Sequence, residues 1–271
     1  MADEKVRYLA FDIASATDGG LVSRLQYPGQ NLEPSAAVRR YRDELREKHN
    51  SDFVPYTFQI PIAVAVAKIA ADYRIIDVVL LDEPRLRPHV ITEHFWRGWE
   101  RYHRPTLVSF NGRAFDLPLM ELATFRYGVS APGWFNVAAK SFEQSRNRFN
   151  LEAHIDLQEL LTNFGCTRFM GGLSLAANLL GKAGKMDVQG HMIQQMYEEN
   201  RLAEVGDYCR CDLLDAYFVF LRTRVMFGDL TLDEEHTLVQ HTKDWLERES
   251  SKVRAFRLYL DRWGDWPNPR T

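Results

Sequence analysis

The sequence predicts an α/β protein in which an N-terminal mixed β-sheet is covered by helices. Mostly apolar runs rich in Val and Ile, which are typical of buried strands, occupy residues 6–13, 57–69 and 74–82. An amphipathic pattern at 89–103 predicts a helix, and a short apolar strand follows it at 106–110. From residue 151 onward the patterns are mainly helical.

The first three strands are expected to form a meander, because Asp72 and Tyr73 mark a turn between the second and the third. The first strand ends in the polar, small stretch SATDGG. Residues 17–55 are predicted to be an insertion, with a Gly- and Pro-containing loop and a charged surface helix that begins at Pro34.

A second group of predicted elements, which are mainly helices, begins after Asn111 and Gly112. Pro105 ends the preceding helix, and a further helix is predicted from residue 115 to Gly128, a typical C-terminal glycine. The remaining helices are expected at residues 152–165, 171–181, 189–208, 207–228 and 233–250.

Length and composition indicate a folded chain. Its 271 residues are 45% hydrophobic, which suffices for a substantial core. We expect residues 1–271 to form a single domain, with a core at about 6–227, the insertion at 17–55 and a helical extension at 230–271. No apolar stretch is long enough to span a membrane and no signal peptide is evident, which favours the cytosol.

Net charge and cysteine content exclude few classes of function. A net charge of −3 gives no global sign of a nucleic-acid partner, although a nuclease needs only a basic groove. Cys166, Cys209 and Cys211 suit a reducing compartment. Cys209 and Cys211 are two apart within a helical pattern and so point to different faces, which disfavours a zinc site.

Asp12 is the first candidate site residue. Side chains alternate along a strand, so Asp12 and residue 14 share one face near the end of the first strand. Residue 14 is Ala14, where an acid would complete a paired carboxylate. Taken alone, an Asp at the end of a buried strand more often has a turn or cap role.

Asp116 follows a strand and starts the next helix in the segment SFNGRAFD. Loops at strand ends are where open α/β sheets place their chemistry, and Asn111 precedes Asp116 in the same loop. The competing interpretation is an N-cap for a helix starting near Leu117, with Pro118 in its first turn. The two roles are compatible.

Tyr208 and Asp212 are four residues apart in DYCRCDLLDAYF, so they lie on one helix face, one turn apart. A phenol there can hydrogen-bond a water near the carboxylate. The ordinary alternative is a half-buried Tyr208 and a solvated Asp212, and only the combination and order of the motifs make the pattern specific.

Together these motifs resemble the DEDDy branch of the DEDD 3′–5′ exonucleases. The segments FDIA, SFNGRAFDLPLM, AHIDL and DYCRCDLLDAYFVFLR are most similar to predicted exonucleases related to the proofreading domain of family B DNA polymerases. The resemblance covers about residues 6–227. It implies a ribonuclease H-like fold, a five-stranded mixed sheet flanked by helices.

The resemblance implies roles for individual residues. Asp12, Asp116 and Asp212 would hold two divalent cations, Mg²⁺ or Mn²⁺, and Tyr208 would orient the attacking water. Asn111 and Phe115 would contact the terminal nucleotide, whereas Asp156 would have a supporting structural role. The implied reaction is hydrolysis at the 3′ end of single-stranded DNA or RNA, releasing nucleoside monophosphates.

Basic residues are candidates for a track that binds the nucleic-acid phosphates. Their alternative is ordinary solvated charge, which is equally compatible with exposed Arg and Lys. The candidates are Arg113, Lys140, Arg146, Arg148, Lys182 and Lys185.

Ala14 is the departure from the family pattern. A methyl group cannot coordinate a cation, so one of the two cation sites is predicted to be weakened and turnover slow. Two hypotheses remain: an impaired 3′–5′ exonuclease, and an inactive module that uses the same groove to bind nucleic acid or a protein partner. An ATPase lacks support because there is no P-loop, and no cysteine has an evident nucleophile setting.

Overall fold

The computed structural model describes residues 5–182, 190–266 and 269–270. Within these residues five strands form one mixed sheet in the order β3-β2-β1-β4-β5. Their bounds are β1 (Val6–Thr17), β2 (Gln59–Ala70), β3 (Ile75–Leu80), β4 (Thr106–Ser109) and β5 (His154–Asp156). This is the sheet that the resemblance predicts, with β1 at its centre.

The predicted meander is confirmed, since β1, β2 and β3 are neighbours joined by antiparallel pairing. β4 pairs parallel with β1, and β5 pairs parallel with β4. Parallel neighbours end at the same edge of a sheet, so the loops after β4 and β5 meet there. The motif around Asp116 is therefore brought beside Asp156.

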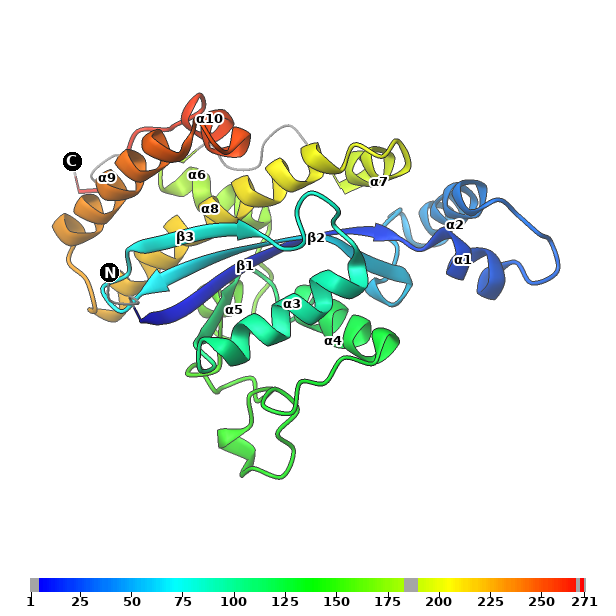
Figure 1. Ribbon diagram of the computed structural model, residues 1–271, viewed down its shortest axis with the longest axis horizontal. Coiled ribbons are helices and arrows are strands. Elements are labelled where there is room, and N and C mark those ends of the chain that lie inside the picture. Colours follow the sequence, from blue (N-terminus) through cyan, green and yellow to red (C-terminus); the bar gives the residue numbers. More distant parts are fainter. Residues whose placement is uncertain (1–4, 183–189, 267–268, 271) are drawn as a thin grey trace.

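Helices cover both faces of the sheet (Figure 1). One face is covered by α3 (Pro88–Arg101) and α4 (Asp116–Tyr127), and the other by the long helix α8 (Leu202–Phe227). Alternate side chains of β1 contact the two helical layers. The Phe11 ring lies 5.1 Å from that of Phe95 in α3, and the Tyr8 ring lies 5.1 Å from that of Phe220 in α8, both measured between centroids. Even-numbered positions of β1, which include Asp12, thus face α8.

The remaining helices lie around this core. In chain order they are α1 (Gly19–Gln26), α2 (Pro34–His49), the 3₁₀ turn η1 (Tyr56–Phe58), the 3₁₀ turn η2 (Ser141–Glu143), α5 (Leu157–Leu161), α6 (Gly172–Leu179), α7 (Gly190–Glu198), α9 (Leu232–Glu249) and α10 (Arg254–Leu260). The helices α1 and α2 project beyond the end of β1 and share a small hydrophobic cluster of their own (Figure 1).

Three sequence-based boundaries are wrong. The helix predicted at 189–208 is divided near Asn200, which has a left-handed φ of 58°, so α7 ends at Glu198 and α8 begins at Leu202 instead of residue 207. β1 continues through SAT to Thr17, because Ser15, Ala16 and Thr17 pair with the start of β2. Cross-strand pairing outweighs the polar character of these residues. The segment predicted as a helix from 152 begins instead with β5, a strand of three buried residues that is too short to show a period.

Candidate active site

Helix α8 and strand β1 bring three of the candidate residues together. Tyr208 and Asp212, both buried, lie one turn apart on α8. Burial raises the pKa of Tyr208, and the charge of Asp212, a hydrogen bond to it and the charge of Asp12 raise that pKa further. The Tyr208 hydroxyl therefore keeps its proton as a hydrogen-bond donor beside two carboxylates.

A pocket of about 460 Å³ opens in front of this group. Ala14 of β1, Phe115 and Tyr208 of α8 all line it. Pockets that hold small ligands have volumes of about 300–1,000 Å³, so the space suits a nucleotide-sized ligand. Three residues singled out from separate sequence motifs thus share one pocket.

Ala14 forms part of the wall of this pocket and is 5% exposed. Its cross-strand partner on β2 is Ala63, so the neighbouring strand brings no carboxylate to this position either. The expected pairing of Asp12 with an acid two residues later is replaced here by a methyl group.

Asp116 is the first residue of α4 and is buried. The N-cap position belongs to Phe115, and no side-chain capping bond is formed there, so the N-cap alternative for Asp116 is wrong. Burial, and next the charge of Asp156, raise the pKa of Asp116 to about 8. A nearby cation would favour the ionised form of this carboxyl group.

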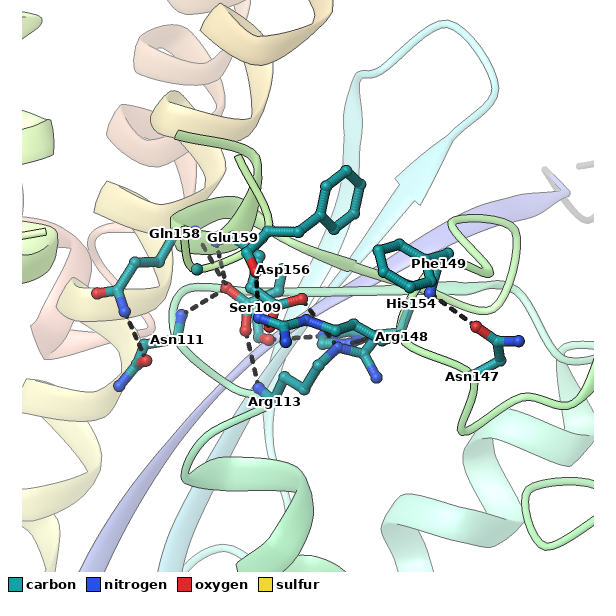
Figure 2. Close-up of polar contacts among 12 residues, drawn as sticks. Ser109, Asn111, Arg113, Asn147, Arg148, Phe149, His154, Asp156, Gln158 and Glu159 are labelled. Atoms are coloured by element: carbon teal, nitrogen blue, oxygen red, sulfur yellow. Dashed lines mark hydrogen bonds and ion pairs between the residues drawn. The ribbon is translucent and has the colours of Figure 1, made fainter. Parts of the chain in front are cut away.

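The loop before Asp116 is held by Asp156 (Figure 2). The Asp156 carboxylate accepts hydrogen bonds from the backbone N–H groups of Asn111 at 3.0 Å and Arg113 at 2.8 Å, and it also caps α5. Asn111 adopts a φ of 61°, and its side-chain oxygen accepts a bond from Gln158 at 2.7 Å. A Cβ at Gly112 would clash with Ser109 Oγ. The supporting role expected for Asp156 is confirmed.

The Arg113 side chain lies in the same network and not in the pocket (Figure 2). Its guanidinium pairs with Glu159 at 3.1 Å and donates to His154 Nδ1 at 3.1 Å. Because arginine cannot accept, Nδ1 must be the unprotonated nitrogen of a neutral His154, whose Nε2–H then donates to Ser109 Oγ at 2.8 Å. Burial, followed by the charge of Arg113, lowers the pKa of His154 well below its ordinary value.

The proposed phosphate track is only partly assembled. Arg113, Arg146 and Arg148 line a second depression of about 610 Å³, where Arg146 pairs with Glu121 at 2.8 Å and Arg148 with Glu159 at 2.8 Å. Exposed Lys140 lies near Phe142.

Lys182 is buried and does not belong to such a track. Its ammonium lies 3.8 Å from the centroid of the Trp263 ring, and burial lowers the pKa of Lys182 to about 8. Lys185 lies outside the described residues.

The two neighbouring cysteines face different elements, as their spacing predicts. Cys209 donates to the carbonyl of Asp12 at 3.1 Å, whereas Cys211 donates to that of Ala255 in α10 at 3.6 Å. Burial is the largest cause that raises the pKa of both thiols.

The donor chemistry suits a divalent cation, since Asp12, Asp116 and Asp212 offer the oxygen ligands that Mg²⁺ and Mn²⁺ prefer. In the part of the chain that the structure describes, however, no group of three or more His, Cys, Asp or Glu side chains is placed to hold a metal ion. Mg²⁺ is commonly bound by one or two carboxylates together with substrate phosphates, and such a site requires no complete protein cage.

Residues that the sequence motifs did not indicate also line the pocket, among them Arg42, Asp52, Phe53 and Gln194. Arg42 of α2 and Phe53, which follows that helix, belong to the insertion. Nothing in their local sequence distinguishes them from surface residues, because their role depends on where the insertion folds back. Gln194 of α7 lines the pocket too and accepts a bond from the backbone N–H of Thr17 at 2.7 Å.

No helix among the described residues has the length and apolar character needed to cross a membrane.

Comparisons with known proteins identify a family. A family model described as "Predicted 3'-5' exonuclease related to the exonuclease domain of PolB" matches residues 51–263. The matched range contains Asp116, Tyr208 and Asp212, whereas Asp12 and Ala14 precede it. No curated protein matches the chain.

Among solved structures, the chain is similar to the family B DNA polymerase from the hyperthermophilic archaeon Pyrobaculum calidifontis, with 14% identity and a TM-score of 0.49. The similarity covers 81% of this chain and 24% of the polymerase chain. This chain therefore corresponds to about a quarter of the length of that polymerase.

Proposed function

Because the chain belongs to the family of predicted 3′–5′ exonucleases related to the exonuclease domain of PolB, we propose that it removes nucleotides from the 3′ ends of single-stranded DNA or RNA. Residues 1–271 would act as one exonuclease unit. The observation that carries the proposal is the position of Tyr208, which lines the pocket one helical turn from Asp212 of α8 and close enough to Asp12 of β1 for that charge to raise its pKa.

Each residue has a distinct task in this proposal. Asp12, Asp116 and Asp212 would hold Mg²⁺ or Mn²⁺ together with phosphate oxygens of the strand. Such a cation, when bound, lowers the pKa of water and offsets the charge that develops on the leaving oxygen. Tyr208 would hydrogen-bond the attacking water and fix its line of approach to the terminal phosphodiester.

The loop at Asn111–Asp116 would set the position of the substrate. Phe115 lines the pocket and offers a ring face to the terminal base, a contact that tolerates any base. Asn111 and Arg113 are fixed by Asp156, so they would act by holding the loop that presents Phe115 and Asp116. Ala14 supplies no ligand, and turnover is therefore expected to be slow.

Ala14 also supports a second candidate function. A site without one acid can retain the pocket and its aromatic residue while losing catalysis, and the chain would then act as a binding module for a 3′ end or for a protein partner. Both functions require the same pocket, so only the fate of a bound strand separates them.

Digestion of 5′-labelled single-stranded DNA and RNA, with Mg²⁺ or Mn²⁺, tests the proposal. An exonuclease gives a ladder of products shortened one nucleotide at a time from the 3′ end, and Asp212→Asn abolishes it. A strand that binds and stays intact would support the binding module instead. An unchanged ladder from Asp212→Asn would exclude this site as its source.

A further inference from the structure

The insertion contributes a second wall to the pocket. Arg42 of α2 and Phe53 line the pocket together with residues supplied by β1 and α8. The Phe53 ring centroid lies 5.8 Å from that of Phe115, with the two rings inclined at 57°. An aromatic residue of the insertion is thus placed beside the aromatic residue of the core.

Phe53 has no evident structural function. It is 60% exposed, and it belongs to neither of the hydrophobic clusters formed by the described residues. Its described ring contact is with Phe115, at the pocket. Exposed aromatic rings beside a pocket are the usual platforms for unpaired bases.

Arg42 brings a guanidinium to the pocket, which Asp52 also lines. The Arg42 guanidinium is 3.0 Å from Oδ2 of Asp52, and the same oxygen is 3.0 Å from the guanidinium of Arg46. Arg46 also pairs with Asp43 at 3.0 Å. Asp52 would keep Arg46 as its partner if Arg42 turned toward a phosphate. Of the two arginines, Arg42 lines the pocket.

We propose that the insertion forms a nucleotide subsite in which the 3′-terminal base stacks on Phe53 and the adjacent phosphodiester pairs with Arg42. The subsite rests on the proposed exonuclease function and assigns the recognition of the strand end to a segment outside the catalytic motifs. Stacking accepts every base, so the subsite recognises an unpaired nucleotide without reading its identity.

Binding of a short single strand tests the role of Phe53. The strand carries a phosphorothioate at its last linkage to limit cleavage, and its affinity is measured by fluorescence anisotropy with Mg²⁺. Phe53→Ala should weaken binding about 5- to 100-fold, and Phe53→Trp should restore it. Leu25→Ala, which removes another exposed side chain of the insertion, serves as the control and should bind as the unaltered chain does.

An abasic 3′-terminal nucleotide separates stacking from a general effect. The unaltered chain should lose at least as much affinity for the abasic strand as Phe53→Ala costs, and removal of the base should cost Phe53→Ala less than it costs the unaltered chain. Equal affinity of Phe53→Ala and the unaltered chain for the complete strand would overturn the subsite alone. Failure of the unaltered chain to bind any strand would overturn the proposed function as well.

Salt dependence tests Arg42 against a matched neighbour. Each phosphate contact on a single strand contributes about 0.7 to the slope of log affinity against log salt concentration. Arg42→Gln should reduce the slope by about that amount, whereas Arg46→Gln, which removes a partner of the same Asp52 oxygen, should leave it unchanged. Equal slopes for both variants would remove Arg42 from the subsite.

Discussion

At the scale of the residue, Tyr208 joins the helix motif to the pocket. Its hydroxyl is next to Asp212 on the same helix and is affected by the charge of Asp12 on β1. In the proposed mechanism Tyr208 would hold a water molecule, because its raised pKa prevents it from serving as a base near neutral pH.

Tyr208→Phe should therefore lower the rate of 3′ nucleotide release by up to about 100-fold while KM changes little. The measurement is steady-state kinetics in an Ala14→Glu background, where turnover is expected to be measurable. Tyr217→Phe is the matched control, because Tyr217 lies on the same helix but donates its hydroxyl to the carbonyl of Tyr73 at 2.9 Å. Equal rate losses in both variants would indicate a general effect on α8.

His154 makes stability depend on pH. Its folded-state pKa is well below the ordinary value because of burial and of Arg113. Below about pH 6.5 His154 becomes protonated in the unfolded chain but stays neutral in the folded chain. The free energy of unfolding therefore falls as pH falls through that value.

The expected loss approaches about 1.4 kcal/mol for each pH unit below 6.5, down to the folded pKa. Urea unfolding at several pH values measures it. His154→Gln should flatten the dependence, whereas His49→Gln, at an exposed position, should retain it. A slope that survives His154→Gln would assign the effect to other groups.

At the scale of the element, Asp156 connects the end of β5 to the loop after β4. Its carboxylate accepts four backbone N–H groups, two from Asn111 and Arg113 and two from Gln158 and Glu159. The short strand β5 is thereby fixed beside the loop that carries Phe115 and Asp116.

Asp156→Ala should lower the free energy of unfolding by about 2–4 kcal/mol, because it leaves several N–H groups of a buried loop without an acceptor. Asp18→Ala is the comparison, since the Asp18 side chain caps α1 through a bond to Leu21 and pairs with Arg126 at 2.7 Å, and its loss should cost about 1–2 kcal/mol. Chemical denaturation measures both. Similar losses would mean that Asp156 acts only as a cap.

The elements also differ in how far the sequence predicts them. The meander follows from long apolar runs rich in Val and Ile, and α8 follows from a long helical pattern. β5 has three residues and carries no period, and the end of β1 is set by its pairing with β2. Tertiary contacts determine where β5 forms and where β1 ends, and such contacts cannot be predicted from the local sequence.

At the scale of the whole molecule, the pocket is assembled from distant parts of the chain. Ala14, Phe115 and Tyr208 follow from motifs, because a common core fixes their order and their elements. Arg42 and Phe53 could not be predicted, because the position of the insertion depends on packing between α1, α2 and the 3₁₀ turn η1. The resemblance thus indicates the motif residues that line the pocket, but not the residues that the insertion contributes to it.

The deficit at Ala14 can be tested directly, because its side chain faces a pocket of about 460 Å³ with room for a longer group. Ala14→Glu restores a carboxylate two residues after Asp12, and Ala14→Gln gives a side chain of nearly the same shape without the charge. A restored ligand contributes several kcal/mol to transition-state stabilisation.

The decisive measurement is the rate of nucleotide release from a single-stranded 3′ end by the unaltered chain, Ala14→Glu and Ala14→Gln, with Mg²⁺ or Mn²⁺. Ala14→Glu should be faster than the unaltered chain by about 100-fold or more, and Ala14→Gln should not be. Equal rates for all three proteins would contradict the proposal that this chain is a 3′–5′ exonuclease limited by one missing acid.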